Sequence, residues 1–208
     1  MIDWDSCVLW LDSKYFSESY WWDRSKYRND GVVHGAKWKA DAFYFNDTDA
    51  YVDCGNSESL SIGNNLSIEA LFIPVHDGYM IAKKNWDNWN NAYALAFEEA
   101  YRRLIFFGNG ASSVRSNSNV LNINEKAHVV VVAENSGQTR FYINSKQQGS
   151  GTTPTFSGDG DRCFIGARPN TGETAASFIG AYFYFIRVYH KLLSSNEVKI
   201  LYNLATGR

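Results

Sequence analysis

Two tryptophans lie close together in the polar stretch of residues 84–91, Lys-Asn-Trp-Asp-Asn-Trp-Asn-Asn. An indole ring can stack on the apolar face of a pyranose, while amides and carboxylates hydrogen-bond its hydroxyls. The alternative is that one or both rings fold back and plug an end of the fold. The sequence predicts a sugar site made of Asn85, Trp86, Asp87, Asn88, Trp89 and Asn90.

The carboxylates give no sign of catalysis. Glycoside hydrolysis by retention needs two of them about 5–5.5 Å apart across the bond, and alternate residues of a strand share a face. Glu98 and Glu99 are adjacent and point to opposite faces, and the residue two beyond Glu69 is Leu71. The chain has no G-x-S-x-G elbow and no P-loop. We therefore expect no enzyme.

The histidines are scattered, without metal-ligand spacing. His128 opens an apolar strand, so we interpret it as a core histidine with a hydrogen-bond partner. Glu69 is interpreted as a strand residue that is either solvent-facing or hydrogen-bonded.

Short apolar or alternating segments, separated by Gly, Asn, Asp and Ser, are typical of a β-sandwich. Residues 66–73 alternate as a half-buried strand does, and residues 128–133 are apolar without a break, which predicts a central strand. Residues 138–144 are expected to pair back with them across a turn at 134–137. Strands are expected near residues 7–11, 42–45, 51–54, 66–73, 79–83, 93–97, 103–107, 128–133, 140–143, 162–167 and 178–189.

Only the end of the chain looks helical. Ser194 and Glu197 form a capping box, and Gly207 gives a stop. Between them Val198 and Leu201 share one helical face. We expect one short helix that packs on a sheet.

Composition narrows the class of protein. The chain has 208 residues, 45% of them hydrophobic, and a net charge of -2, so it lacks the basic excess that phosphate contacts need. No apolar segment approaches the ~18 residues of a membrane span, and the acidic, polar start is not a signal peptide. The cysteines are Cys7, Cys54 and Cys163; we expect three structural thiols, and their pairing stays open.

Several motifs occur in a recognisable order: residues 42–52, 66–74, 141–146, 165–166 and 183–194. Together they resemble the laminin G-like jelly rolls of the concanavalin A-like lectin/glucanase superfamily. The resemblance implies an all-β fold, a two-sheet antiparallel β-sandwich with one short C-terminal helix, as a single domain over residues 1–208. The chain departs from the family at Ser145, where a turn glycine is usual, and at Tyr184, where Asp is frequent.

The same resemblance implies a metal. Related domains can carry a structural calcium ion in the loop that follows residues 20–22, and calcium prefers six to eight oxygen ligands. Asp23, Asn29 and Asp30 could supply some of them. The alternative is a turn in which Asp23 accepts hydrogen bonds from backbone amides.

These observations predict a non-catalytic carbohydrate-binding or adhesion module that acts at a surface. Its expected partner is a glycan or cell-surface glycoconjugate, with no nucleic acid and no membrane insertion, and its expected place is extracellular or on a virion surface. One alternative is a structural or protein-interaction domain of an extracellular or virion assembly. A residual alternative is a glycoside hydrolase.

Overall fold

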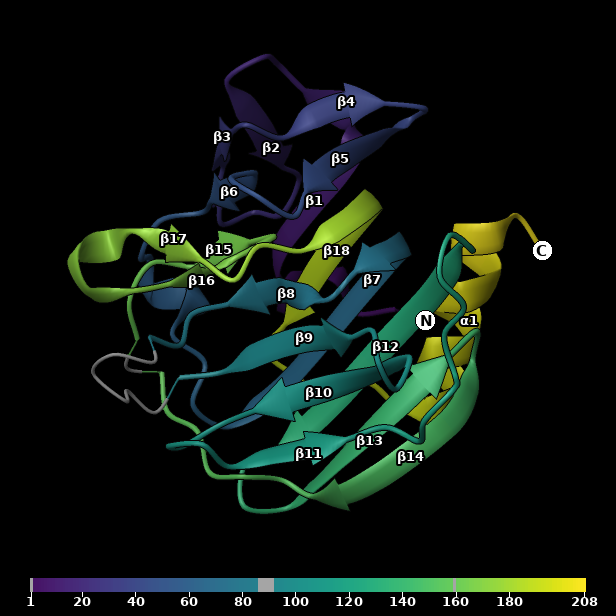
Figure 1. The fold of residues 1–208 in the computed structure, drawn as a ribbon. Coiled ribbons are helices and arrows are strands. Elements are labelled where there is room, and N and C mark those ends of the chain that lie inside the picture. The colour runs from purple at the N-terminus through teal and green to yellow at the C-terminus, as the bar shows by residue number, and fades with distance from the viewer. Residues whose placement is uncertain (1, 86–91, 159) are drawn as a thin grey trace.

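The protein is a two-layer β-sandwich, the predicted class. The computed structural model describes residues 2–85, 92–158 and 160–208. Most of its strands follow one hydrogen-bonded path that doubles over, so that β8 to β11 lie in front of β7 and β12 to β14 (Figure 1). We refer to the two layers as the back sheet and the front sheet.

The back sheet contains the first and last strands of the sandwich, which pair with each other. Its strands are β1 (Cys7–Phe16), β4 (Lys37–Lys39), β5 (Ala42–Asn46), β7 (Asn65–His76), β12 (Ala127–Glu134), β13 (Gln138–Ile143), β14 (Lys146–Thr152) and β18 (Gly180–Tyr189).

The front sheet joins the back sheet through the pairing of β1 with β2. Its strands are β2 (Tyr20–Asp23), β3 (Gly31–His34), β6 (Tyr51–Asp53), β8 (Gly78–Ala82), β9 (Ala94–Glu98), β10 (Arg103–Phe107), β11 (Ser113–Arg115) and β15 (Phe164–Ile165). The remaining elements are β16 (Arg168–Pro169), β17 (Ala175–Ala176), the 3-10 turns η1 (Trp4–Ser6), η2 (Glu58–Leu60) and η3 (Thr171–Glu173), and the helix α1 (Ser195–Thr206).

The main core fills the space between the sheets. From β7, Leu66, Ile68, Ala70 and Phe72 all point into it, as the alternation predicts. Phe72 is fully buried and stacks on Phe183 of β18, with ring centroids 5.6 Å apart. Because side chains alternate along a strand, the residues of β7 between these four point to the outer side of the back sheet.

A second, smaller core lies on that outer side, beneath α1. Val130 and Val132 of β12 pack there with Val198 and Leu201 of the helix, so β12 is buried on both faces as predicted. The capping box of Ser194 and Glu197 is present, and Gly207 ends the helix in the left-handed conformation. The helix therefore covers one part of the outer face of the back sheet and leaves the rest uncovered (Figure 1).

Gly166 marks a close approach between the layers. Its φ is +86°, and a Cβ added there would lie 2.2 Å from Cδ1 of Phe45. Any side chain would both strain the backbone and displace a core aromatic ring, which explains the Ile-Gly pair of the sequence motif at residues 165–166.

Phe72→Ala should test the packing of the main core. Removing a fully buried ring that stacks on Phe183 is expected to lower the free energy of unfolding by about 3–5 kcal/mol. Urea unfolding followed by tryptophan fluorescence measures this change. A loss below about 1 kcal/mol would mean that the two sheets are not packed as described.

Candidate functional site

A groove crosses the uncovered part of the outer face, between α1 and the β4–β5 hairpin. Its volume is ≈ 870 Å³, near the upper end of the range of about 300–1,000 Å³ typical of small-molecule sites. We call it the outer groove. Strands β1 and β18 form its floor, with walls from η1, β4 and α1, and it is lined by Trp4, Trp10, Asp12, Ser13, Lys14, Phe16, Trp38, Asp41, Leu71, Lys126, Tyr184, Phe185, Arg187, Leu204 and Ala205.

The register of β1 and β18 explains why these floor residues meet. Trp10 pairs with Arg187, and Asp12 pairs with Phe185. Their chain neighbours, such as Leu11 and Ile186, point into the main core. Period-two alternation therefore places the polar and aromatic members of both strands on the outer face together.

Trp38 forms a fixed aromatic platform at the β4 end of the outer groove. Its indole Nε1 donates a hydrogen bond of 3.1 Å to the backbone oxygen of Ser13. One face of the ring stacks on Phe16, with centroids 5.6 Å apart, and Phe16 in turn contacts Phe43 edge-on. The residue remains 47% exposed, so it presents an open apolar surface in a fixed orientation.

At the α1 end, aromatic rings surround the guanidinium of Arg187. Its Cζ lies 4.1 Å from the ring centroid of Phe185, 4.4 Å from that of Trp10 and 5.4 Å from that of Trp4. Lys126, which also lines the outer groove, has its Nζ 3.6 Å from the ring centroid of Tyr184. Cation–π attraction holds both cations against the groove wall.

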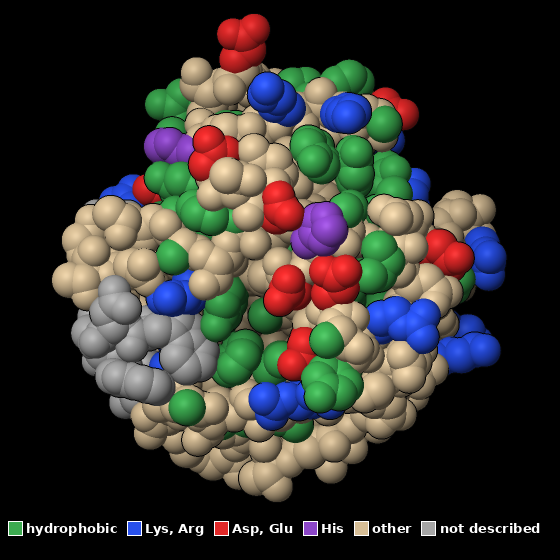
Figure 2. Space-filling view, viewed as in Figure 1, with side chains coloured by type: hydrophobic (Ala, Val, Ile, Leu, Met, Phe, Trp, Pro, Cys, Tyr) green, Lys and Arg blue, Asp and Glu red, His purple; other side chains and the backbone are tan. Residues whose placement is uncertain are grey.

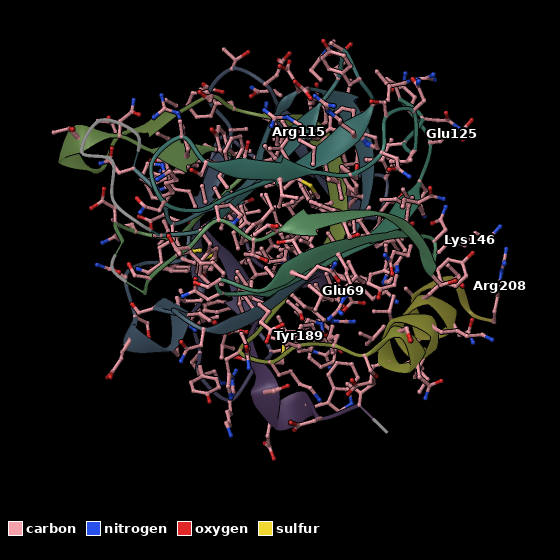
Figure 3. All side chains as sticks on the ribbon, turned by 90° about the horizontal axis from the view of Figure 1, so that it is seen from below. Glu69, Arg115, Glu125, Lys146, Tyr189 and Arg208 are labelled. Atoms are coloured by element: carbon pink, nitrogen blue, oxygen red, sulfur yellow. The ribbon has the colours of Figure 1, made fainter. Side chains whose placement is uncertain are left out.

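A buried charge network fixes Arg187 from below. Glu69 of β7 accepts hydrogen bonds of 3.1 Å from Arg187 Nη1 at both carboxylate oxygens and one of 2.6 Å from the Tyr189 hydroxyl. His128 Nε2 lies 2.9 Å from Glu69 Oε1. Because an ionised carboxylate can only accept hydrogen bonds, His128 Nε2 is the donor in this bond. Figure 3 shows Glu69 and Tyr189 in the layer between the back sheet and α1.

The network shifts three pKa values. Burial alone raises the pKa of Glu69, but the charge of Arg187 and the bonds from His128 and Tyr189 outweigh it and hold that pKa below its ordinary 4.5. Burial lowers the pKa of Arg187, yet the Glu69 charge raises it overall. Burial and the same charge raise the pKa of Tyr189. Glu69 is thus ionised and enclosed, which confirms the hydrogen-bonded interpretation and that of His128 as a core histidine.

The predicted sugar site mostly lies outside the described residues, since these stop at Asn85 and resume at Ala92. Asn85 is buried, and its amide donates to the carboxylate of Asp161. The adjoining Lys84 is also buried, and burial lowers its pKa to about 8. The prediction for Trp86, Asp87, Asn88, Trp89 and Asn90 stays a prediction.

The residues of the outer groove were missed from the sequence. Trp38 occupies a three-residue strand with lysines on both sides, too short for a periodic signal. In the sequence, Trp10 is recognisable only as part of the strand expected near residues 7–11. The available signal was the high number of aromatics, 13 Phe, 13 Tyr and 7 Trp, since aromatic side chains also build recognition surfaces.

The predicted calcium ligands lie together in a hydrogen-bonded loop. Asp23 Oδ1 accepts from the backbone nitrogens of Trp10 (2.7 Å) and Ser25 (2.9 Å). Its Oδ2 accepts from Ser25 Oγ (2.6 Å) and Asn29 N (2.7 Å). Asp30 Oδ1 accepts from Asp23 N, and the Asn29 amide nitrogen donates to Val8. Both carboxylate oxygens of Asp23 already accept hydrogen bonds, which favours the turn alternative, and the calcium site stays a prediction.

The remaining candidates for metal or redox chemistry among the described residues are clustered metal ligands and the cysteines. Among them, no group of three or more His, Cys, Asp or Glu side chains is placed to hold a metal ion. The three cysteines are buried and free. Burial raises the pKa of Cys7 and of Cys163 to about 12, which keeps both as unreactive thiols.

Figure 2 shows cationic and anionic side chains interspersed on one face, rather than a wide field of one sign. Within the described ranges, no helix is both long enough and apolar enough to cross a membrane.

Glu69→Gln should destabilise the protein at neutral pH by about 3–5 kcal/mol, because it leaves the Arg187 charge buried and uncompensated. The wild-type stability should also depend on acid pH. The folded pKa of Glu69 is lowered, so its contribution is present above about 4.5 and is lost as pH falls through the folded value. Urea unfolding between pH 2 and 7 measures both effects. In Glu69→Gln, the loss of unfolding free energy at acid pH should be smaller than in the wild-type protein. Glu125→Gln is the control, because it removes an exposed carboxylate.

Asp23→Ala should lower the thermal midpoint strongly, because it leaves several buried donors without an acceptor, at about 1–3 kcal/mol each. Adding a chelator to the wild-type protein should leave the midpoint unchanged. Scanning calorimetry with calcium and with chelator tests this. A calcium-dependent rise in the midpoint that disappears in Asp23→Asn would restore the calcium site.

Comparisons with known proteins place the fold in a family. Residues 46–199 match the family model Laminin_G_3, described as the concanavalin A-like lectin/glucanases superfamily. No curated protein sequence matches the chain.

Solved structures of similar fold include the binding domain of botulinum neurotoxin serotype D/C (TM-score 0.70, 15% identity, 97% of this chain and 52% of that chain). The same domain of neurotoxin DC, in complex with rat synaptotagmin II, gives a TM-score of 0.71 at 14% identity, over 97% of this chain and 52% of that chain. A mutant Trypanosoma rangeli sialidase with trans-sialidase activity gives a TM-score of 0.69 at 15% identity, over 95% of this chain and 32% of that chain.

The chain spans about half the length of the neurotoxin domains, and at these identities the likeness concerns the fold alone. The family match covers most of the chain, including β7, the β12–β13 hairpin and β18. The chain belongs to the concanavalin A-like lectin/glucanase superfamily, as a laminin G-like jelly roll.

Proposed function

We propose that this chain is a non-catalytic carbohydrate-binding module and that the outer groove is its sugar site. The observation that carries the proposal is the fixed, open face of Trp38 beside polar side chains in a groove of ≈ 870 Å³. A pyranose ring needs such an apolar platform with hydrogen-bonding groups at its edge.

The polar groups next to the platform suit sugar hydroxyls. Asp12, Lys14 and Asp41 line the same end of the outer groove, on β1 and in the turn between β4 and β5. Carboxylates accept from hydroxyls, and an ammonium donates to them. Because Ser13 Oγ donates to the Asp41 backbone oxygen at 2.6 Å, the turn that carries Asp41 is tied to the strand that carries Asp12 and Lys14.

We also propose that the groove does not cleave its ligand. Asp12 accepts from the Lys14 backbone nitrogen at 3.0 Å, and its Oδ2 lies 3.7 Å from Arg24 Nη1. Glu69 is enclosed by its partners. Incubation with candidate oligosaccharides should release no reducing ends, and a hydrolysis lost in Asp12→Asn or Asp41→Asn would favour the glycoside hydrolase instead.

The named relatives support a binding role. Cell entry of botulinum neurotoxin type C depends on interaction with two ganglioside molecules, and the binding domain of neurotoxin DC has been solved in complex with SialylT and with rat synaptotagmin II. Glycans and proteins are thus both bound by proteins that contain this fold. The site predicted at residues 85–90 remains a second place for a sugar.

A protein-binding role in an extracellular or virion assembly is the second candidate. It is favoured by exposed aromatics outside the outer groove, such as Tyr20 and Trp22, which stack on each other at 5.0 Å and are each 40% exposed. Light scattering separates the two candidates: a stable oligomer with no glycan affinity would favour the assembly role.

Trp38→Ala should weaken glycan binding at least about tenfold, since the loss of one stacking platform costs about 1.4 kcal/mol or more. The measurement is a glycan-array screen, followed by calorimetric titration of the best glycan. Trp22→Ala is the matched control, because it removes an exposed tryptophan that does not line the groove.

Unchanged affinity in Trp38→Ala would rule out the outer groove as the sugar site. If the double variant Trp86→Ala with Trp89→Ala then lost binding, the site would be the one predicted at residues 85–90.

A further inference from the structure

The two ends of the outer groove differ in charge. At the β4 end, the charged lining residues are Asp12, Lys14 and Asp41, two acids and one base. At the α1 end, the lining side chains with a charge are Lys126 and Arg187. Glu69, below the floor, balances one of these two positive charges, so the α1 end keeps one in excess.

Donors without acceptors gather under the α1 end. Arg187 is 8% exposed, and Nη1 makes both of its bonds to Glu69. Its Nε and the indole Nε1 of Trp10 are buried without a hydrogen-bond partner among the described residues. Buried donors in native proteins normally have an acceptor, so this end favours an acceptor-rich group.

The surroundings strengthen the preference for an anion. Phe185, Trp10 and Trp4 enclose the Arg187 guanidinium, and such an apolar environment makes a charge–charge contact stronger than it is in water. Lys126 is held at the rim by its contact with Tyr184. A guanidinium and an ammonium together suit a carboxylate better than a hydroxyl.

We propose that the α1 end of the outer groove binds the carboxylate of an acidic sugar, through Lys126 and Arg187. The ligand is then an acidic oligosaccharide whose neutral ring stacks on Trp38 while its charged residue lies toward α1. The inference rests on the proposed function, because it assigns the charge of the ligand at that site.

Matched probe pairs that differ in the carboxylate test the proposal. The pairs are 3′-sialyllactose with lactose, and trigalacturonic acid with its methyl ester, each titrated calorimetrically at low and at high salt. The acidic member of at least one pair should bind about tenfold more tightly than its neutral partner at low salt. High salt should reduce that difference, because exposed charges such as Lys126 are screened.

Variants then locate the effect. Lys126→Gln should reduce binding of the acidic probe about fivefold and leave the neutral probe unchanged. Lys146→Gln, at an exposed lysine of β14 that does not line the outer groove, should change neither. Arg187→Lys keeps a positive charge beside Glu69 but removes the planar guanidinium with its several donors. It should also lower the affinity for the acidic probe and leave that for the neutral probe unchanged. Should it fail to fold, Lys126→Gln alone decides.

Each outcome has a distinct meaning. If acidic and neutral members bind equally while Trp38→Ala abolishes both, the acidic-sugar assignment is wrong and the carbohydrate-binding function stands. If acidic preference persists in Lys126→Gln and Arg187→Lys, the carboxylate binds elsewhere. If no probe and no array glycan binds, both proposals are wrong.

Discussion

The ionised carboxylate of Glu69 is the constraint on which the outer face of the back sheet depends. It lies on β7, at the point where three central strands meet, and it draws its partners from β12 and from two positions of β18. A buried charge is tolerated only when it is paired and hydrogen-bonded. Any slip of β18 or β12 against β7 would leave Glu69 unpaired, so the network opposes changes of register in the middle of the sheet.

The same network connects the fold to the site. Arg187 reaches down to Glu69 and upward into the aromatic enclosure of the outer groove. Its guanidinium is therefore oriented before any ligand arrives, which lowers the entropy cost of binding. Asp23 acts in a comparable way from the other side, because it holds the backbone of Trp10 through a hydrogen bond of 2.7 Å. The loop interpreted as a calcium site thus positions a residue of the groove.

Sequence periodicity predicted the parts of the fold that are buried on at least one regular face. It located β7, β12 and the β12–β13 hairpin, and the capping box located α1. It missed β4, which has only three residues, none of them buried, and β14, whose residues are all polar or glycine. Short edge strands carry few buried side chains, so their hydrophobic pattern is weak.

The site could not be predicted in the same way, because it depends on which strands lie side by side. Trp10 and Arg187 are far apart in the sequence and become neighbours only through the β1–β18 register. Trp38 joins them through β4 and β5, which approach from the edge of the sheet. The sequence instead favours residues 85–90, where tryptophans and amides are adjacent in the chain, a pattern that needs no tertiary contact to be noticed.

Tyr184 shows how a departure from the family pattern acquires a physical meaning once the neighbours are known. An acid is frequent at this position, and an acid here would be expected to pair with Lys126 and cancel its charge. The tyrosine instead offers a ring face, at 3.6 Å from centroid to Nζ, so Lys126 is held in place and keeps its positive charge. Because α1 covers only the β12 side of the outer face, this lysine borders the groove rather than the second core. With tyrosine at position 184, no negative charge stands at this position of the groove, which agrees with the anionic ligand that we propose.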